Sequence, residues 1–417
     1  MSPLAHLEVR GAATPEERAQ ADDLIAKTQL VDYWVARRWL DTVGRDMPGF
    51  KLEHTRIAWV DGEMAGALRL ITADLRIGKA RWKTGGFGWV STIPAFRNSG
   101  VCRALIEDTH AYMAANHYHA AQLFGIANFY HRFGYTVSLA DHTIRLEVSS
   151  IADLQDTTLD IRPLREEHIP HLLRLHDLHE EKASCSMVRT AEDWKNQFRE
   201  VRPVTPLGAD WHRAMGLFDG QGRLTAYFSP QTERDGLHIK EIGTESSSVH
   251  PALLQTCVNR AREQDKATIV FHLPPFHPFA RFLEDFDSHH TTEHYRCREG
   301  MMILINPGAA LTAMLPEWDA QLAESAARNR PASFTVQTGG LYWCIKSDGV
   351  RVTIHANEKC GPVAAIAGET LLRWTTGFAH VEDWLELHGQ GWGANESALL
   401  RAIFPKRNPF VWPADHY

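Results

Sequence analysis

One order of predicted elements occurs twice in this 417-residue chain, and this repeat restricts the fold more than any other feature. The first copy has a strand at residues 7–10, a helix from Pro15, and a hairpin in which Asp61-Gly62 joins two apolar runs. The same order recurs in residues 159–162, 166–177 and 214–228, where Asp219-Gly220 forms the turn. The repeat predicts two α/β units in tandem.

The residues after Asn306-Pro307-Gly308 follow a different plan. A helix is expected at 318–328, followed by four strands and two or three short helices. This order is typical of a separate α+β domain. We therefore expect an α/β (α+β) chain with domains at residues 1–150, 151–305 and 306–417.

Composition excludes several classes of protein. Hydrophobic residues make up 44% and charged residues 23%, which is typical of a soluble globular chain. The net charge of -7 argues against a nucleic-acid partner and suits a cationic amine substrate. No secretory signal or membrane-spanning stretch is evident, and the six scattered cysteines indicate free thiols in a reducing cytoplasm.

The stretch from Val90 to Leu105 is the most informative for function. A strand is expected to end at Pro94, and a turn containing Gly100 opens the next helix. The free N–H groups of a helix N-terminus attract anions, and a glycine lets a pyrophosphate approach the backbone. Arg97 and Arg103 add positive charge. The pattern fits a phosphate-binding loop, but an ordinary strand-to-helix turn has the same appearance.

A second element follows about thirty residues later. It reads Asn128-Phe129-Tyr130-His131-Arg132-Phe133-Gly134-Tyr135. With the preceding loop, its order resembles the GNAT acetyltransferase superfamily. The resemblance implies that the strand before the loop splays from its neighbour, that the thioester lies in the gap, and that Tyr130 lies near the cofactor sulfur. The alternative for Tyr130 is a core aromatic, like Phe129 and Phe133.

The expected chemistry explains these residue types. An attacking amine must lose a proton to a base, and the tetrahedral oxyanion needs a donor, which the backbone N–H groups of residues 90–92 can supply. The departing thiolate needs a proton, and a phenol with a pKa of ~10 can donate it. The second unit reads Glu245-Ser246-Ser247-Ser248 where the loop should be, and Ala280 or Arg281 stands near the Tyr130 position. We therefore expect one acetyl-CoA site per chain.

The arrangement as a whole resembles the enhanced intracellular survival (Eis) family of N-acetyltransferases. The most specific parts are residues 90–103, residues 129–135 and the tail from Leu399 to Tyr417. The resemblance implies a third domain like a sterol carrier protein. It places the acetyl-CoA contacts, together with the loop arginine, at Val90, Ser91, Thr92, Arg97, Asn98, Ser99, Gly100, Val101, Cys102, Arg103, Gly125 and Ile126. Asn98 and Ser99 depart from the family's consecutive basic residues, and Cys102 replaces the usual small residue.

The resemblance also implies an unusual general base, the free carboxylate of the last residue, Tyr417. An α-carboxylate has a pKa of ~3.5, so burial would be needed to make it effective. His416 and Asp415 are alternative candidates for the base. The alternative for the terminus itself is a frayed chain end without a role, which is usual for most chains. The resemblance further implies a polyamine, aminoglycoside or lysine-like acceptor and a homohexamer.

Two other sequence features do not change this interpretation. The 23 histidines show no metal-binding spacing, so no metal is expected, and His168, His171, His176 and His179 are interpreted as a solvated helix face. The run Glu180-Glu181-Lys182 is likewise expected at the surface. The competing hypothesis for function is a non-catalytic protein that senses acetyl-CoA or binds a lipid. The presence of Tyr130 beside the loop argues against it.

Overall fold

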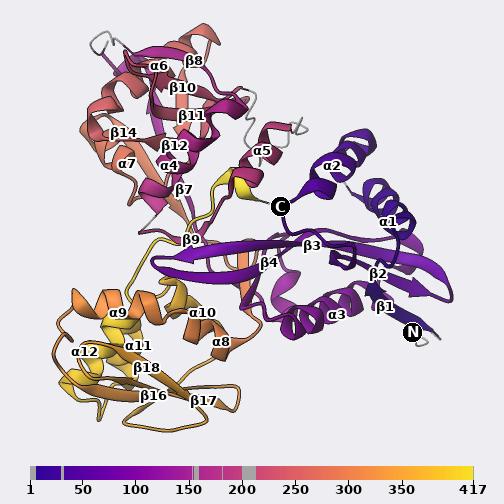
Figure 1. The fold of residues 1–417 in the computed structure, drawn as a ribbon, viewed down its shortest axis with the longest axis vertical. Helices are drawn as coiled ribbons and strands as arrows, with labels where there is room; N and C mark the ends of the chain where they lie inside the picture. The colour runs from indigo at the N-terminus through magenta and orange to yellow at the C-terminus, as the bar shows by residue number, and fades with distance from the viewer. Residues whose placement is uncertain are drawn as a thin grey trace.

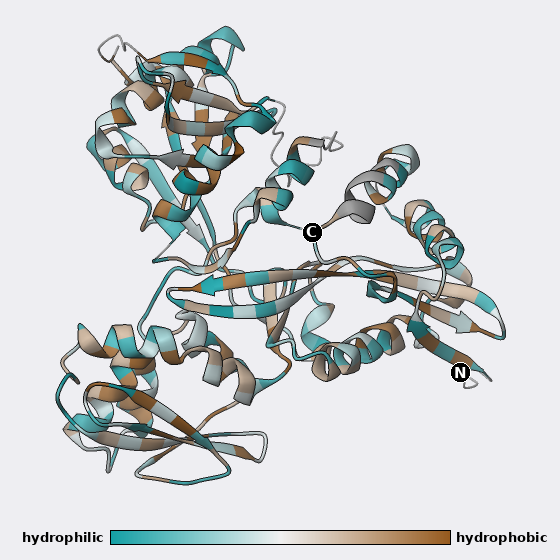
Figure 2. Cartoon of the chain, viewed as in Figure 1, coloured by the Kyte–Doolittle hydropathy of each residue, from teal (hydrophilic) through white to brown (hydrophobic). Residues whose placement is uncertain are grey.

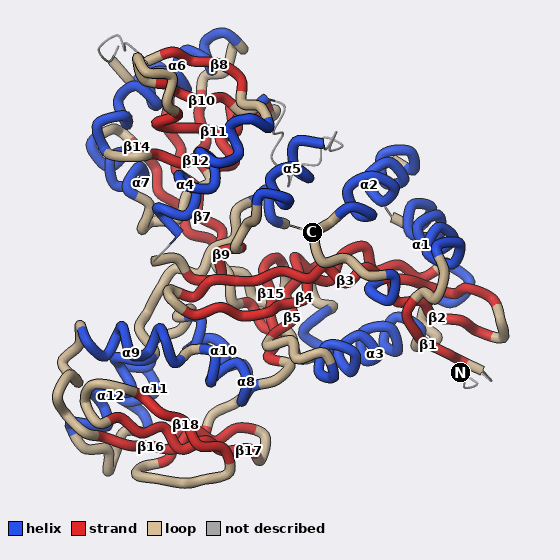
Figure 3. Tube along the Cα trace, in the orientation of Figure 1, coloured by secondary structure: helices blue, strands red, loops and turns tan. Residues whose placement is uncertain are grey.

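The computed structural model describes residues 6–29, 32–152, 154, 159–180, 182–199 and 213–416 (Figure 1). This part of the chain contains three sheets, of eight, seven and four strands. Each sheet carries its own helices, and the three bodies meet near the middle of the molecule (Figure 3). The mixed α/β architecture with a third α+β domain confirms the expected fold class.

The first sheet contains the loop and Tyr130. Its order is β1 (Leu7–Gly11), β2 (Thr55–Val60), β3 (Glu63–Ile77), β4 (Ala80–Thr92), β5 (Ala120–Gly125), β15 (Glu299–Leu304) and β6 (Thr136–Val137), and β9 (Ser184–Met187) extends β3. Helices α1 (Pro15–Thr28) and α2 (Tyr33–Asp46) lie on one face and α3 (Val101–Ala115) on the other (Figure 1). Helix α1 begins where expected because the Thr14 hydroxyl accepts from the Glu17 N–H, at 3.2 Å.

The second sheet repeats this plan. Its order is β14 (Ser288–Glu293), β7 (Asp141–Glu147), β13 (Thr268–Phe271), β12 (Leu237–Thr244), β11 (Leu224–Thr232), β10 (Met215–Phe218) and β8 (Asp160–Pro163). The accompanying helices are α4 (Ile169–Glu180), α5 (Ala191–Arg199), α6 (His250–Glu263) and α7 (Pro278–Phe282). Both Asp-Gly turns connect antiparallel strands, so both predicted hairpins are present.

The two units exchange strands across the expected boundaries. Strand β7 leaves the first unit and pairs with β13 and β14 in the second sheet. Strand β15 returns from the second unit and pairs with β5, with Glu299 opposite Gly125 and Leu304 opposite Ala120. The chain therefore does not pass from one sheet to the other at residues 150 and 305. Ladders between strands about 180 residues apart leave no local signal, so the repeat could not indicate the exchange.

The third domain carries the sheet β18 (Val352–Ala356), β17 (Leu341–Ser347), β16 (Ala332–Thr338) and β19 (Val363–Ala365). Its helices are α8 (Pro307–Ala313), α9 (Leu315–Ala323), α10 (Gly368–Thr376), α11 (Val381–His388) and α12 (Ala394–Ile403). Its core continues into the first unit, where the Trp82 indole donates to the Ala310 carbonyl at 3.1 Å. Figure 2 shows the apolar residues concentrated in the sheets and in the helix faces toward them.

Two cysteines correct the expectation that all six are free thiols. Cys344 on β17 and Cys360, before β19, form a disulfide in the third domain. They lie close because β17 and β19 flank β16, an arrangement that their 16-residue separation does not reveal. Cys102, Cys185, Cys257 and Cys297 are free. None of the described helices has the length and apolar character that crossing a membrane requires.

Candidate active site

The first sheet opens between strands β4 and β5. These parallel strands pair at only three positions, from Thr84 opposite Ala120 to Gly86 opposite Gln122. Both strands then continue, β4 to Thr92 and β5 to Gly125. A register shift against β3 and the positive φ of Trp89, 60°, mark a bulge in the part of β4 that no longer pairs with β5. Beyond Gly86 this edge of β4 has no pairing with β5, so it is available to a ligand.

Helix α3 starts directly after this open edge. Asn98 and Gly100 have φ values of 62° and 102°, and no side chain caps the N-terminus at Gly100. A Cβ at Gly100 would meet no atom within 4 Å, so the positive φ, and not crowding, requires glycine in this conformation. The Ser99 hydroxyl donates to the Phe96 carbonyl at 2.6 Å and fixes the turn. The uncapped N–H groups suit an anion.

Two guanidinium groups flank this helix start. The Arg97 side chain is exposed, and its Nε donates to the Thr92 carbonyl at 3.4 Å. Arg103 lies over the Phe133 ring at 5.0 Å and pairs with Glu107 at 3.3 Å. Because the Arg103 side chain is 56% exposed, the pair with Glu107 is weak and leaves the guanidinium available to phosphate.

Tyr130 lies on the other side of the opening, in a single 3₁₀ turn, η3 (Tyr130–Phe133). A Cβ added at Gly125 would stand 2.6 Å from Tyr130 Cδ2, so the ring packs directly on the end of β5. Burial raises the pKa of the Tyr130 phenol above its usual value. The phenol therefore stays protonated at neutral pH. Burial also raises the pKa of the neighbouring Cys102 thiol to about 11, which makes it a poor nucleophile.

The C-terminal tail, here residues 405–416, runs from the third domain back to the centre of the molecule (Figure 1). The Phe410 N–H donates to the Ser184 carbonyl at 2.9 Å. At its end, the His416 imidazole stacks on the Phe124 ring of β5, with 3.6 Å between centroids and 19° between planes. Phe124 precedes Gly125, so the tail and Tyr130 meet the same strand. Tyr417, the expected base, lies outside the described residues.

A cavity of about 210 Å³ is bordered by His416, the tail residue that stacks on Phe124. It is lined by residues of α2 and the following loop, β3, the β9–α5 segment and the tail, among them Trp39, Asp74, Asp193, Gln197, Asp415 and His416. Three of these six carry a carboxylate. The Asp193 carboxylate accepts from the Thr190 N–H and hydroxyl, both at 2.7 Å, and Asp415 is bound to Arg189. Asp74 is exposed.

Sequence reasoning missed several residues that hold this site. Gln29, at the end of α1, donates to the Val90 carbonyl at 3.2 Å and to the Ser91 hydroxyl at 2.8 Å. Glu180, expected at the surface, is 3% exposed and accepts from the Trp412 indole at 2.9 Å. His176, expected on a solvated face, is 4% exposed. The partners of Gln29 and Glu180 lie 61 or more residues away in the sequence, so only the proximity of Gln29 to a helix end gave any signal.

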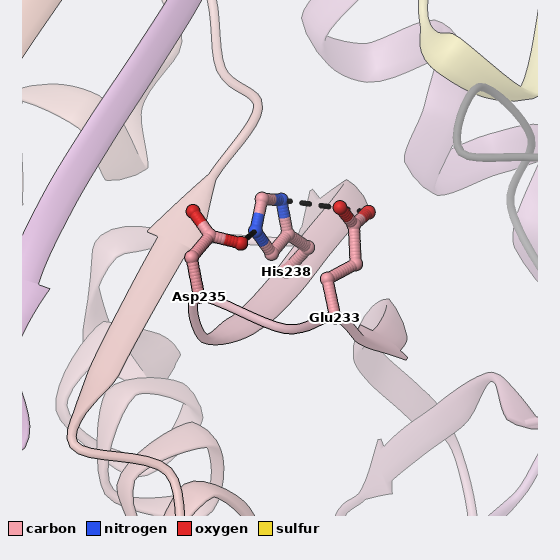
Figure 4. Close-up of side chains that lie close together, drawn as sticks. All are labelled: Glu233, Asp235 and His238. Atoms are coloured by element: carbon pink, nitrogen blue, oxygen red, sulfur yellow. Dashed lines mark hydrogen bonds and ion pairs between the residues drawn. The ribbon is translucent and has the colours of Figure 1, made fainter.

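Among the described residues, one group brings three potential metal-binding side chains together. His238 Nε2 lies 3.0 Å from Asp235, and its Nδ1 lies 3.6 Å from Glu233. Figure 4 shows the two carboxylates on opposite sides of the ring, and one ligand atom from each of the three residues lies within 4.8 Å of the others. Lys240 Nζ, 2.6 Å from Glu233, and Arg145, 2.9 Å from Asp235, already supply positive charge. The group is an ion-pair network, and it lies in the second unit.

The match to a known protein family lies in the first unit. Residues 14–138 match the family model described as an acetyltransferase (GNAT) domain. No curated protein matches the chain. The first unit is thus matched as a GNAT acetyltransferase domain, which supports an N-acetyltransferase with an acyl-CoA co-substrate.

Solved structures share the fold over the whole chain. A GCN5-related N-acetyltransferase from Anabaena variabilis has a TM-score of 0.73 and 16% identity, over 99% of this chain and 100% of that chain. One from Kribbella flavida has a TM-score of 0.71 and 15% identity, over 99% and 98%. Eis1 from Mycobacterium abscessus has a TM-score of 0.64 and 14% identity, over 99% and 100%. At these identities the likeness shows the fold.

Proposed function

We propose that the chain transfers the acetyl group of acetyl-CoA to a primary amine by direct attack, with Tyr130 as general acid and the terminal carboxylate of Tyr417 as general base. One observation carries the proposal. The half-buried ring of Tyr130 packs on Gly125, and His416 stacks on the adjacent Phe124, so the acid and the tail meet neighbouring residues of one short strand, from its two faces.

The opening between β4 and β5 fits acetyl-CoA, which supplies the acetyl thioester. The free edge of β4 offers backbone groups to an amide-containing chain, and the uncapped start of α3 offers N–H groups to a pyrophosphate. Ile126, next to Gly125, is 68% exposed, which suits an apolar contact with a ligand. The residues proposed to hold acetyl-CoA are Val90, Ser91, Thr92, Arg97, Asn98, Ser99, Gly100, Val101, Cys102, Arg103, Gly125 and Ile126.

Each proton transfer has an assigned group. The base takes a proton from the ammonium, and the free amine attacks the acetyl carbonyl. Backbone N–H groups of residues 90–92 stabilise the oxyanion. As the C–N bond forms and the C–S bond breaks, Tyr130 gives its proton to the sulfur, and the second proton that the nitrogen loses on becoming an amide restores the Tyr130 phenol. Its raised pKa keeps that proton available across the neutral range.

The alternative bases are not equivalent. Two Arg189 nitrogens donate to the Asp415 carboxylate, both at 2.9 Å, so protonation of Asp415 would break a buried ion pair. His416 Nε2 lies 3.3 Å from the Val411 carbonyl, which holds the imidazole in place. These contacts disfavour Asp415, so the terminal carboxylate of Tyr417 stays the proposed base, with His416 as the second candidate.

The acceptor is proposed to be an amine of low molecular weight or a lysine side chain, as in a polyamine or an aminoglycoside. The cavity bordered by His416 supports this because Asp74, Asp193 and Asp415 line it, and a carboxylate-lined cavity attracts an ammonium group. Its volume of about 210 Å³ limits the buried part of the acceptor to a small group.

The first test is thiol release from acetyl-CoA with a panel of primary amines. We expect Tyr130→Phe to lower kcat roughly 100-fold or more, the usual contribution of a general acid. Tyr112→Phe is the matched control because the hydroxyl of Tyr112, a residue of α3, donates to Glu53 at 3.0 Å. Equal rates for Tyr130→Phe and the wild type would remove Tyr130 from the mechanism.

The second test adds one alanine after Tyr417. An added residue converts the proposed carboxylate base into a neutral amide, so we expect a loss of kcat of roughly 100-fold or more. His416→Gln, with the natural terminus retained, is the comparison. Full activity with the added alanine, together with inactivity of His416→Gln, would transfer the role of base to His416.

The hexamer and the likeness of the third domain to a sterol carrier protein rest on the family resemblance, and the cytoplasmic location rests on the cysteine pattern and the lack of a secretory signal; all three stay predictions. Light scattering measures the assembly directly. Extraction of the purified protein with organic solvent, followed by mass spectrometry, tests the third domain for a bound lipid. A bound lipid without turnover of any amine would favour the competing binding function.

A further inference from the structure

The second unit contains the same opening as the first. Strands β12 and β13 run parallel and pair at three positions, from Leu237 opposite Ile269 to Ile239 opposite Phe271. Strand β12 then continues to Thr244 without this partner, as β4 does beyond Gly86. The second opening is therefore a structural counterpart of the proposed acetyl-CoA site.

The chain's own tail lies at this second opening. The 3₁₀ turn η9 (Pro413–Asp415) contacts β12, and the Trp412 ring lies 6.2 Å from the ring of His277, which follows β13. Phe410 and Trp412 are buried in the same hydrophobic cluster as Ile239 and Phe271. The tail thus touches both sides of the opening beyond the last strand pair.

One guanidinium joins the tail to the opening. Arg189, in the segment between β9 and α5, donates to both oxygens of Glu241 on β12, at 2.8 and 2.7 Å. It also donates to both oxygens of Asp415 in the tail. All three side chains are 0–1% exposed. Such buried, bidentate bonds fix orientation because no water replaces them when they break.

Further contacts fix the rest of the tail. The Trp412 indole donates to Glu180 at 2.9 Å, and the Gln197 amide reaches Asp415 at 3.5 Å. The Tyr227 hydroxyl donates to Glu241 at 2.9 Å and holds that carboxylate in place for Arg189. Every one of these partners belongs to the second unit or to the β9–α5 segment. His416, one residue after Asp415, then stacks on Phe124 of the first unit.

We propose that the opening in the second unit is a peptide-binding site for the chain's own C-terminal segment, and that Arg189 is the positioning residue that sets where this segment ends. In this proposal a fold that binds acetyl-CoA in one copy holds part of the catalytic machinery in the other. The consequence for catalysis rests on the proposed function, whereas the binding of the tail does not.

The test variant is Asp415→Ala, studied in the full-length protein. It leaves the bidentate pair between Arg189 and Glu241 complete, so no buried charge loses its partner and the fold is retained. Asp415→Asn, which keeps one acceptor oxygen for Arg189, is the conservative variant. Glu386→Ala, on the exposed side of α11, is the control.

Two readouts separate tail binding from catalysis. Hydrogen–deuterium exchange of residues 405–417 should be at least about tenfold faster in Asp415→Ala, intermediate in Asp415→Asn and unchanged in Glu386→Ala. The kcat of Asp415→Ala should fall roughly 10- to 100-fold, because a displacement of about 1 Å costs that much, while the Kd for acetyl-CoA changes less than about twofold. Titration calorimetry should give one acetyl-CoA per chain.

The outcomes are distinguishable from those of the proposed function. If no amine is acetylated, faster exchange in Asp415→Ala still supports the peptide-binding site. Unchanged exchange of the tail in Asp415→Ala would overturn the site, and so would two acetyl-CoA molecules per chain. Faster exchange with unchanged kcat would overturn the positioning role of Arg189.

Discussion

The two α/β units open the same pair of parallel strands and fill the opening differently. In the first unit, β4 carries Gly85, Gly86 and Gly88 around the split, so this part of the strand has no charged side chain, and Leu70 and Met113 pack against Gly85. In the second unit, the corresponding part of β12 carries Lys240 and Glu241, whose charged side chains are buried. A cofactor would have to displace these side chains and the ion pairs they form.

The difference shows how a duplicated fold can divide a task. The first opening keeps a free strand edge beside an uncapped helix start, so it can accept an anionic ligand. The second has its open end occupied by a peptide, whose Asp415 is bound through Arg189. The geometry of the splayed sheet is shared, and the side chains along it decide what is bound.

The strongest way to break this comparison is to remove a buried guanidinium from each unit. Arg189→Ala leaves Glu241 and Asp415 buried without their cation, so we expect a loss of about 3–5 kcal/mol in the free energy of unfolding. Arg69→Ala, which removes the buried partner of Asp22 in the first unit, should lose a comparable amount. Urea titration measures both losses.

Only Arg189→Ala should release the tail. Hydrogen–deuterium exchange of residues 405–417 in mild denaturant, at equal residual stability, compares the two variants directly. Equal exchange of the tail in Arg189→Ala and Arg69→Ala would mean that Arg189 contributes general stability and no specific anchor.

A matched pair of histidines tests whether both units lose stability in acid by the same cause. Burial lowers the pKa of His110 in the first unit and of His250 in the second, each to about 4. Unfolded histidine has a pKa of ~6.5, so the unfolded state binds more protons below that pH. Stability is then complete above pH 6.5 and falls as the pH decreases toward 4.

Replacing either histidine by phenylalanine should flatten this fall. His110→Phe and His250→Phe each remove one titrating group, so the free energy of unfolding should decrease less between pH 7 and pH 5 than in the wild type. Urea titrations at pH 7, 6 and 5 measure the slope. A slope unchanged in His250→Phe alone would show that this side chain is not desolvated as deeply as its first-unit counterpart.

Much of this architecture could be predicted from local patterns. The Asp61-Gly62 and Asp219-Gly220 turns indicated the two hairpins, and Gly100 indicated the start of α3 at Val101. These features follow from backbone preferences within a few residues. The loop residues and Tyr130 also come together at one opening, as their order along the chain indicated.

The remaining features depend on contacts between distant segments. The exchange of β7 and β15, and the burial of Glu180 against Trp412, join residues more than 120 positions apart. A charged run such as Glu180-Glu181-Lys182 is ordinarily solvated, and no local pattern reveals that an indole 232 residues away binds Glu180. Arg189 was missed for the same reason.

A smaller effect separates the backbone requirement at Gly100 from its role in binding. Alanine at the φ of 102° observed there should cost about 1–2 kcal/mol in stability, although a Cβ meets no neighbour. Gly62→Ala is the matched control because its φ is 83° and its surroundings are equally open. Both variants should lose similar stability. Only Gly100→Ala should weaken the binding of acetyl-CoA, as measured by calorimetry. Equal affinity in both variants would exclude the helix start from the site.

The smallest expected effect on stability sharpens the difference in charge between the two openings. Arg103→Ala removes an exposed ion pair with Glu107, so the free energy of unfolding should change by less than about 1 kcal/mol. The Kd for acetyl-CoA should nevertheless rise several-fold, because a cation near the phosphates is lost, and the rise should shrink in 0.5 M salt. Glu107→Ala breaks the same ion pair and should leave the Kd equal or lower. A rise in both variants would mean that the pair itself orders α3, and that Arg103 does not reach the phosphates.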